Sequence, residues 1–366
     1  MRATGSHVST HGVVSNSYAT GQVASIGEYV GGLVGYNSSA GTVNESHATG
    51  SVTATGNGTS TGVEVGGLAG ENVGAVNSSY STGNVSGNGD VGGLIGGNEG
   101  TINTSNASGQ VTGVISGIDL VEGSRSNPFL LEGVYGGLTI GGLVGENSGT
   151  VGSSYATGGV SGLSYLGGLA GYNLGTINNS HAVGNVSTTN YFTSYFVGSF
   201  ATDAGGLVGS NKQGTINTSY ATGNVTGTTN VGGLVGNNTG SAVDTYATGS
   251  VSGASNVGGL VGINTGTVST SYATGSVSGS SEVGGLIGDT PGLGAVSASF
   301  WNVTTSGLTS SAGGTGMTTA QMETQANFTS ATSANGEINP GWNFTSTWYI
   351  TNGVTYPMLQ AFKSTQ

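Results

Sequence analysis

The sequence predicts an all-β fold, a β-solenoid (β-helix) of about ten coils with a repeat period of 26 and an irregular C-terminal cap. A G-G-L-[VAI]-G core recurs nine times along the 366 residues, and an S-Y-A-T-G motif or a variant follows each core. Gly contributes 75 residues, and only 5% of residues are charged. A unit of this length is too short to bury a core alone, so successive units must stack and share one.

The cores set the period of the repeat. Successive cores are offset by 26 or 27 positions in five of eight intervals and by 35, 49 and 38 in the other three. The cores begin at Gly31, Gly66, Gly92, Gly141, Gly167, Gly205, Gly232, Gly258 and Gly284. The insertions of the long coils lie near 53–64, 113–139 and 188–204, just before a core. Insertions in solenoids map to loops on one face, often the binding face.

Each coil is expected to hold three β-stretches, which are clearest in residues 257–282. They are V-G-G-L-V-G, T-V-x-x-S-Y-A-T and the short x-V-S-G, and none has apolar residues at helical spacing. The core glycines are expected to allow close backbone approach and corners with positive φ. Simple alternation places Tyr272 on the side of Val268 but opposite Ala273, so we expect a corner or bulge between Val268 and Tyr272.

Two side-chain ladders are predicted along the rod axis. The Leu of each core should form one inner ridge: Leu33, Leu68, Leu94, Leu143, Leu169, Leu207, Leu234, Leu260 and Leu286. An Asn lies just after eight of the cores: Asn37, Asn72, Asn98, Asn147, Asn173, Asn211, Asn238 and Asn264, with Thr290 in the ninth coil. Stacked side-chain amides hydrogen-bond along a cross-β axis, so we interpret them as an internal ladder, with ligand binding as the alternative.

The units resemble GLUG repeats, which are named for the G-L-[V]-G core. The resemblance extends from about Val14 to Leu359. It includes a C-terminal stretch with Ser299-Phe300-Trp301-Asn302, GGTGMTTAQM at 313–322 and Tyr356-Pro357. Such repeats occur in large bacterial and archaeal surface proteins, including haemagglutinin-like adhesins and some IgA-protease-type precursors. The resemblance therefore implies surface exposure and an adhesive or scaffold role, and it supplies no catalytic residues.

The domain boundaries follow from the period. Residues 1–302 are expected to form the repeat solenoid, and residues 303–366, which break the period, a capping segment over the unpaired edge of the last coil. TTAQMETQA at 318–326 is the expected short helix. The chain begins partway through a coil, so we expect either a truncated or processed chain or an open edge that pairs with another copy.

Composition excludes several partners and chemistries. Sixteen acidic residues face four basic ones (Arg2, Arg125, Lys212 and Lys363), too few to bind nucleic acid or an anionic membrane surface. There is no Cys, no H-E-x-x-H, no phosphate loop and no paired carboxylates for glycosidase work. His47 and His181 occupy the Tyr position of repeats. We therefore expect no enzyme activity, no cofactor, no metal and no membrane insertion.

Two sets of residues are candidates for surface contacts. The third insertion carries an aromatic cluster that is a candidate binding loop: Tyr191, Phe192, Tyr195, Phe196 and Phe200. Fifteen Asn-x-Ser/Thr sequons occur, and Asn37 is set aside as part of the inner ladder. The remaining candidates for N-glycosylation are Asn44, Asn57, Asn77, Asn84, Asn103, Asn106, Asn178, Asn185, Asn217, Asn224, Asn237, Asn302, Asn327 and Asn343.

The favoured function is that of an extracellular structural or adhesive surface protein, either a stalk or a self-assembling fibre subunit. Its expected partners are other copies, arranged head to tail or laterally, or other surface proteins and glycans. The alternative is a ligand-binding solenoid face for glycans or ice. A Thr row consisting of Thr20, Thr49, Thr82, Thr157, Thr222, Thr248 and Thr274 suits ice. However, Ser108 and Val183 interrupt it.

Overall fold

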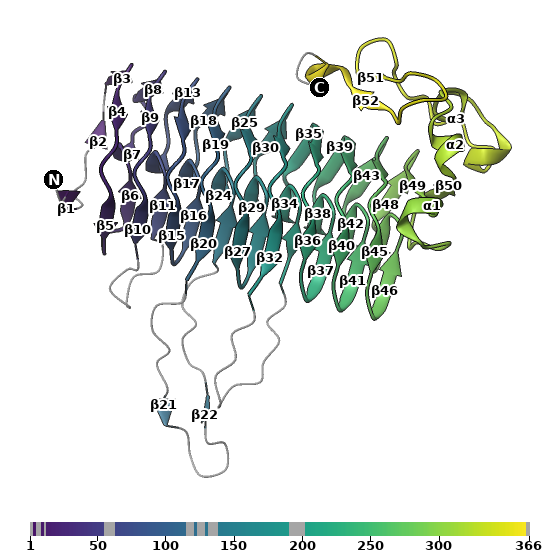
Figure 1. Ribbon diagram of the computed structural model, residues 1–366, viewed down its shortest axis with the longest axis horizontal. Helices are drawn as coiled ribbons and strands as arrows, with labels where there is room; N and C mark the ends of the chain where they lie inside the picture. Colours follow the sequence, from purple (N-terminus) through teal and green to yellow (C-terminus); the bar gives the residue numbers. More distant parts are fainter. Residues whose placement is uncertain are drawn as a thin grey trace.

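The computed structural model describes residues 3–4, 9–10, 12–54, 63–114, 121–122, 129–130, 138–189 and 202–363. Short strands stack side by side into a rod, with the first strands at one end and the C-terminal segment at the other (Figure 1). Within the rod, strands pair in parallel and in register with the equivalent strands of the neighbouring coils. The predicted all-β solenoid is confirmed.

Four sheets run along the rod, and we number them in the order in which one coil visits them. Sheet 1 contains β1 (Ala3–Thr4), β5 (Val23–Ser25), β10 (Val52–Ala54), β15 (Val85–Gly87), β20 (Val111–Gly113), β27 (Val160–Gly162), β32 (Val186–Thr188), β36 (Val225–Thr226), β40 (Val251–Ser252) and β45 (Val277–Ser278). Sheet 2 contains β6 (Tyr29–Gly31), β11 (Glu64–Gly66), β16 (Asp90–Gly92), β23 (Thr139–Gly141), β28 (Tyr165–Gly167), β33 (Ala204–Gly205), β37 (Thr229–Gly232), β41 (Ser255–Gly258) and β46 (Ser281–Gly284).

The other two sheets complete each coil. Sheet 3 contains β2 (Ser9–Thr10), β7 (Val34–Asn37), β12 (Ala69–Asn72), β17 (Ile95–Asn98), β24 (Val144–Asn147), β29 (Ala170–Asn173), β34 (Val208–Asn211), β38 (Val235–Asn238), β42 (Val261–Asn264) and β47 (Ile287–Asp289). Sheet 4 contains β3 (Val13–Ser15), β4 (Tyr18–Ala19), β8 (Thr42–Asn44), β9 (His47–Ala48), β13 (Ala75–Asn77), β14 (Tyr80–Ser81), β18 (Thr101–Asn103), β19 (Asn106–Ala107), β25 (Thr150–Gly152), β26 (Tyr155–Ala156), β30 (Thr176–Asn178), β31 (His181–Ala182), β35 (Thr215–Ala221), β39 (Ser241–Ala247), β43 (Thr267–Ser269), β44 (Tyr272–Ala273), β48 (Ala295–Ser297), β49 (Phe300–Asn302) and β50 (Thr315–Met317). A further antiparallel pair is β21 (Val121–Glu122) with β22 (Phe129–Leu130).

The V-G-G-L-V-G stretch is not the single strand that the sequence predicts. In the best-formed coil the chain leaves sheet 2 at Gly258, bends at Gly259 and Leu260, and enters sheet 3 at Val261. A Cβ built on Gly258 would overlap the carbonyl oxygen of Val261, and one on Gly259 would overlap that of Gly285 in the next coil. The two glycines are therefore required because backbone crowds them, and the bend divides the coil into four sheets instead of three.

The corners with positive φ also lie elsewhere than predicted, since the core glycines do not adopt them. In sheet 4 a non-Gly residue takes this conformation in each coil, and in the clearest coil it is Thr270, with φ 47°. This is the corner expected between Val268 and Tyr272. The next residue satisfies the backbone there: the Ser271 hydroxyl donates to the Ser269 carbonyl at 2.7 Å and accepts from the Thr245 amide of the preceding coil at 3.1 Å.

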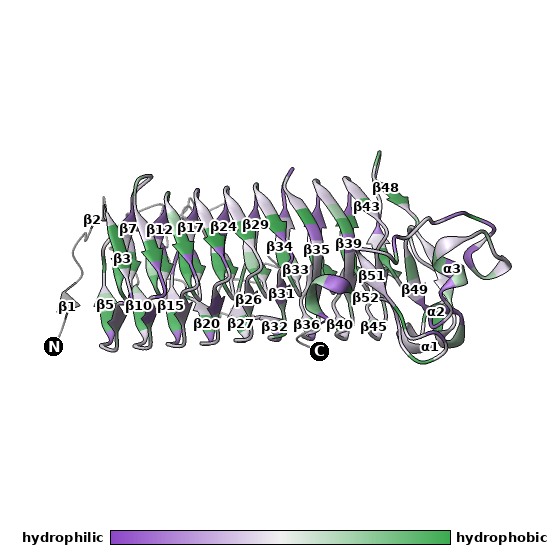
Figure 2. Cartoon of the chain, turned by 90° about the horizontal axis from the view of Figure 1, so that it is seen from above, coloured by the Kyte–Doolittle hydropathy of each residue, from purple (hydrophilic) through white to green (hydrophobic). Residues whose placement is uncertain are grey.

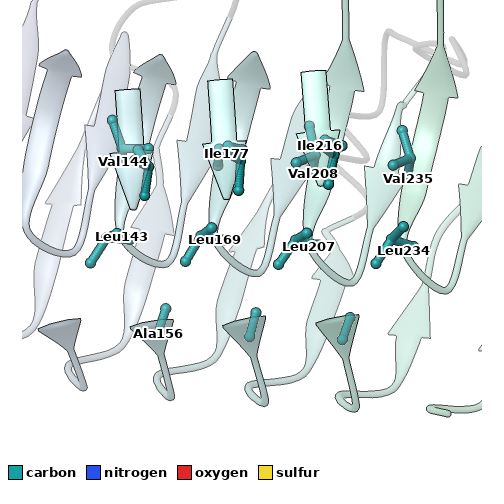
Figure 3. Close-up of a cluster of buried hydrophobic side chains, with 14 of the residues drawn as sticks. Leu143, Val144, Ala156, Leu169, Ile177, Leu207, Val208, Ile216, Leu234 and Val235 are labelled. Atoms are coloured by element: carbon teal, nitrogen blue, oxygen red, sulfur yellow. The ribbon is translucent and has the colours of Figure 1, made fainter. Parts of the chain in front are cut away.

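The interior holds two apolar stacks, and hydrophobic and hydrophilic bands recur from coil to coil (Figure 2). One stack lies between sheets 3 and 4 and contains the Leu ridge, part of which is shown in Figure 3. Leu33 is partly buried, and the other eight Leu side chains are fully buried. The second stack lies between sheets 1 and 2 and consists mainly of Val. Each buried Leu contributes about 1.5–3 kcal/mol, so the ridge binds every coil to its neighbours.

After β49 the C-terminal segment adds one last strand to sheet 4, β50, and the residues that follow fold back along sheet 4 (Figure 1). This C-terminal segment contains α1 (Val303–Ser306), α2 (Thr319–Met322), α3 (Ala326–Thr329), η1 (Ser333–Asn335), η2 (Gln360–Phe362) and the antiparallel pair β51 (Trp348–Tyr349) and β52 (Met358–Leu359). The single helix predicted at 318–326 is thus the shorter α2, and two further short α-helices accompany it. Among the described residues, no helix is long and apolar enough to span a membrane.

Candidate functional site

The predicted Asn ladder is continuous from Asn37 to Asn264. In each step the side-chain Nδ2 donates to the Oδ1 of the next Asn, at 2.7–2.8 Å, through seven successive bonds. All eight side chains are buried, and several also donate to a Gly carbonyl of the same turn, as Asn264 does to Gly266. Thr290 ends the ladder with a buried hydroxyl that has no hydrogen-bond partner among the described residues. Buried amides that are fully hydrogen-bonded are structural, so the ladder presents nothing to a ligand.

A second ladder lies on the outer face of sheet 4, at the residue before the inward-facing position that is Ala in most coils. We call it the aromatic ladder. It consists of Tyr18, His47, Tyr80, Asn106, Tyr155, His181, Tyr220, Tyr246, Tyr272 and Phe300. Neighbouring Tyr and His rings are stacked, with centroids 4.6–5.5 Å apart and planes within 12° of parallel. The repeat therefore forms a row of rings along the rod, with their faces toward one another.

The C-terminal segment covers the last part of this ladder. Trp348 lies against Tyr246 and Tyr272, with ring centroids 6.3 and 6.0 Å away, and its Nε1 donates to Asp244 at 3.1 Å. The Tyr272 hydroxyl donates to the Pro357 carbonyl at 2.6 Å. As a result Tyr272 is only 1% exposed.

Phe362 marks the far end of the covered part. Its ring meets His181 and Tyr220 edge-on, with centroids 5.2 and 4.8 Å away. Burial lowers the pKa of His181 to about 4, so its imidazole is neutral at physiological pH and behaves as one more aromatic ring of the ladder.

The first part of the ladder is uncovered. Tyr18 is 68% exposed, and Tyr80 and Tyr155 are 37% and 38% exposed. Asn106 interrupts the rings between Tyr80 and Tyr155 and pairs in register with both. This exposed row, with a gap at its centre, is the candidate functional surface of the described residues.

Carboxylates gather on sheets 2 and 3 at the same end of the rod. Glu64 and Asp90 are direct neighbours in register, and Glu71 and Glu146 lie nearby in sheet 3. Desolvation, reinforced by the charges of neighbouring carboxylates, raises the pKa of Glu64 to about 9. Desolvation also raises the pKa of Asp90 to about 7, against a hydrogen bond from Thr139 at 2.5 Å. One Glu64 carboxylate oxygen is buried without a hydrogen-bond partner among the described residues.

Farther along sheet 2 the equivalent position holds one carboxylate followed by two amides, Asp203, Asn230 and Asn256. Asn256 donates to Asn230 at 2.7 Å, and Asn230 donates to Asp203 at 2.8 Å. No group of three or more His, Asp or Glu residues within the described ranges has the arrangement of a metal site. We call Glu64, Glu71, Asp90 and Glu146 the acidic corner. Their carboxyl groups are crowded against one another, which favours the protonated forms.

The predicted surface residues fall into three classes. The aromatic loop cluster Tyr191, Phe192, Tyr195, Phe196 and Phe200 and the sequon at Asn57 lie outside the described residues. Asn302 and Asn327 are buried, at 0% and 6% exposure, so these two glycosylation predictions are wrong for the folded protein. Asn302 instead caps α1, since its Oδ1 accepts from the amide of Thr304 at 2.8 Å.

The remaining sequons have accessible Asn side chains. Asn84, Asn103, Asn185, Asn224 and Asn343 are exposed. Those that are half-buried are Asn44, Asn77, Asn106, Asn178, Asn217 and Asn237.

Comparison with known proteins agrees with this repeat geometry. The model of the GLUG motif matches residues 26–53 and 253–278. The chain carries the GLUG motif. Each GLUG match runs from sheet 2 through sheets 3 and 4 to sheet 1, so one GLUG motif corresponds to one coil of the rod. Neither a curated protein nor a solved structure matches the chain.

Proposed function

We propose that this GLUG-motif β-solenoid is an extracellular structural or adhesive protein of the cell surface, with the rod as a stalk or as the subunit of a fibre. The observation that carries the proposal is the unbroken stack: the buried Leu ridge and the Asn ladder connect coil to coil. Ten strands in sheets 1 and 3, at about 4.8 Å per strand, correspond to a rod on the order of 50 Å long.

Composition is consistent with rods that do not associate non-specifically. Sixteen acidic residues against four basic ones make the rod anionic, which keeps such particles apart in solution. A stack of this kind is a spacer, because each coil contacts only its neighbours and the length grows with the number of coils. The exposed part of the aromatic ladder offers a contact surface along one side of the rod. The proposal assigns the chain no catalytic activity.

Two measurements test this function. Immunogold labelling of intact cells of the source organism should place the protein outside the membrane; labelling that appears only after permeabilisation contradicts the proposal. Negative-stain electron microscopy of purified chain separates the two forms. A stalk gives particles about one rod long, whereas a fibre subunit gives rods of indefinite length, and globular particles overturn both.

A further inference from the structure

The gap in the aromatic ladder has a defined size. Tyr80, Asn106 and Tyr155 occupy the same position in three successive coils, on β14, β19 and β26. Parallel strands lie about 4.8 Å apart, so the two Tyr rings are separated by roughly twice that distance. Where the ladder is continuous, as at Tyr220 and Tyr246, ring centroids are 4.8 Å apart. The space between Tyr80 and Tyr155 is therefore that of one missing ring.

The walls and the floor of this space differ in chemistry. Each wall is the face of a Tyr ring whose other face stacks on a His ring. The ring centroids of Tyr80 and His47 are 4.6 Å apart, and those of Tyr155 and His181 are 5.1 Å apart. The floor is Asn106, whose side-chain amide is half-buried and has no hydrogen-bond partner within the described residues. The site thus offers two aromatic faces and, between them, an amide that can donate and accept hydrogen bonds.

A sugar ring has the complementary pattern. A pyranose presents C–H groups on its faces and hydroxyls around its edge, so it satisfies aromatic walls and a polar floor together. A purely apolar ring would leave the Asn106 amide without a partner. An anionic ligand is disfavoured by the net charge of −12. The chemistry favours a neutral sugar.

We propose that the slot between Tyr80 and Tyr155 binds one neutral pyranose ring, with the Asn106 side chain at the ring's edge, either hydrogen-bonded to it or covalently linked to it. The ring has two potential sources. Asn106 begins the sequon Asn106-Ala107-Ser108, so the sugar can be the first residue of a glycan attached to this chain. It can equally belong to a separate polysaccharide. The slot needs only the described coils and does not depend on whether the rod is a stalk or a fibre.

The first experiment distinguishes these sources. Peptide mass spectrometry of protein from its native cells shows whether Asn106 carries a glycan. If it does, the proton resonances of the attached sugar should shift upfield through the ring currents of both Tyr residues, and Tyr80→Ala should remove about half of that shift. An attached sugar with unshifted resonances overturns the proposal, because the ring then lies outside the slot.

If Asn106 is unmodified, the proposal is tested by the binding of sugars that are not attached to the chain. Full-length protein from a bacterial host without N-glycosylation is titrated with maltohexaose, cellohexaose, chitohexaose and mannohexaose by calorimetry and saturation-transfer NMR. At least one of these sugars should bind. Asn106→Tyr places the usual ladder residue in the slot and should therefore weaken the affinity for that sugar by 10-fold or more. Tyr155→Ala should do the same by removing one wall.

Controls keep the outcome decisive. Asn106→Tyr restores the side chain that most coils carry, so its thermal unfolding and circular dichroism should match those of the wild type. Tyr36→Ala changes a half-buried Tyr of sheet 3, outside the ladder, and should leave sugar binding unchanged. An unmodified Asn106 together with no binding by any of the four sugars overturns the proposal. So does binding that Asn106→Tyr leaves intact, since the sugar then sits elsewhere.

Discussion

The exposed part and the covered part of the aromatic ladder consist of the same position of the repeat, but their side chains lie in opposite environments. Tyr80 is 37% exposed, whereas Tyr272 is 1% exposed, although both precede a small buried residue in sheet 4. The difference comes from residues far away in the sequence, since Pro357 accepts the Tyr272 hydroxyl hydrogen bond and Trp348 packs on its ring. A repeat therefore sets where a side chain points, and a non-repeating segment decides whether that side chain becomes core or surface.

The substitution with the largest expected effect on stability lies at the covered end of the aromatic ladder. Trp348 is fully buried against Tyr246, Tyr272 and Trp342. Trp348→Ala leaves a cavity and should lower the free energy of unfolding by about 3–5 kcal/mol. Urea denaturation followed by circular dichroism measures the loss. Hydrogen exchange should show faster exchange at Tyr246 and Tyr272, and unchanged exchange there would contradict the covering role of the C-terminal segment.

The Asn ladder runs through both parts of the rod, so the loss of one ladder Asn should lower the free energy of unfolding by the same amount in each part. Asn72→Ala and Asn238→Ala each remove one donor and one acceptor from a chain of buried amides. Each change should cost about 1–3 kcal/mol, because the neighbouring amides lose partners that water cannot replace. Urea denaturation of the two variants provides the comparison. A much larger cost at Asn238 would mean that the C-terminal segment, and not the ladder, dominates stability.

The acidic corner should make the exposed end sensitive to pH. The folded pKa values of Glu64 (about 9) and Asp90 (about 7) lie above their ordinary values of 4.5 and 3.8. The folded state then holds more protons than the unfolded state, so this stabilisation is complete below about pH 4 and falls as pH rises. It is lost by about pH 7 for Asp90 and about pH 9 for Glu64.

Amide substitutions test this pH dependence. Glu64→Gln with Asp90→Asn should raise the free energy of unfolding at pH 8 by at least about 1 kcal/mol and flatten its pH profile. Asn230→Asp places a carboxylate beside Asp203 at the other end and should introduce a similar dependence there. Thermal unfolding between pH 4 and 9 reports both effects. A wild-type profile that rises with pH would refute the assignment.

The smallest effect is expected at the open tip of the ladder. Tyr18 is 68% exposed and contacts only one neighbouring ring, that of His47, within the described residues. Tyr18→Ala should change the free energy of unfolding by less than about 0.5 kcal/mol. This variant is also the control for Trp348→Ala, because each removes one aromatic side chain that contacts a ring of the ladder, Tyr18 at the open tip and Trp348 at the covered end. Comparable losses in the two variants would remove the contrast between the two ends.

The period predicted the features that repeat in every coil. Leu260 and Asn264 hold fixed positions in the unit, and stacking with a constant period forces each over its equivalent in the next coil. The division at Gly259 was missed, since V-G-G-L-V-G has the composition of one strand and the bend is set by the carbonyl oxygen of Gly285 in another coil. Such contacts between coils are invisible in a single unit.

The corner before Ser271 shows a different limit. The sequence implied a corner but not its residue, because Thr270 at φ 47° is neither Gly nor Asn. The role of Ser271 could have been inferred from its recurrence in S-Y-A-T-G, which places a hydroxyl wherever the backbone turns. The covering of Tyr272 could not be inferred, because the segment 303–366 has no repeat to specify its register. The gap at Asn106 was not predicted, although the sequence shows Asn in place of the Tyr at this position of the repeat.

The Asn ladder also gives the rod an electrical direction. Every Nδ2 points toward the C-terminal end and every Oδ1 toward the N-terminal end, from Asn37 to Asn264. Aligned amide dipoles add up along a line, and each bond polarises the next. The ladder thus adds a dipole of one fixed direction along the rod, so the interior of the rod is polar from one end to the other.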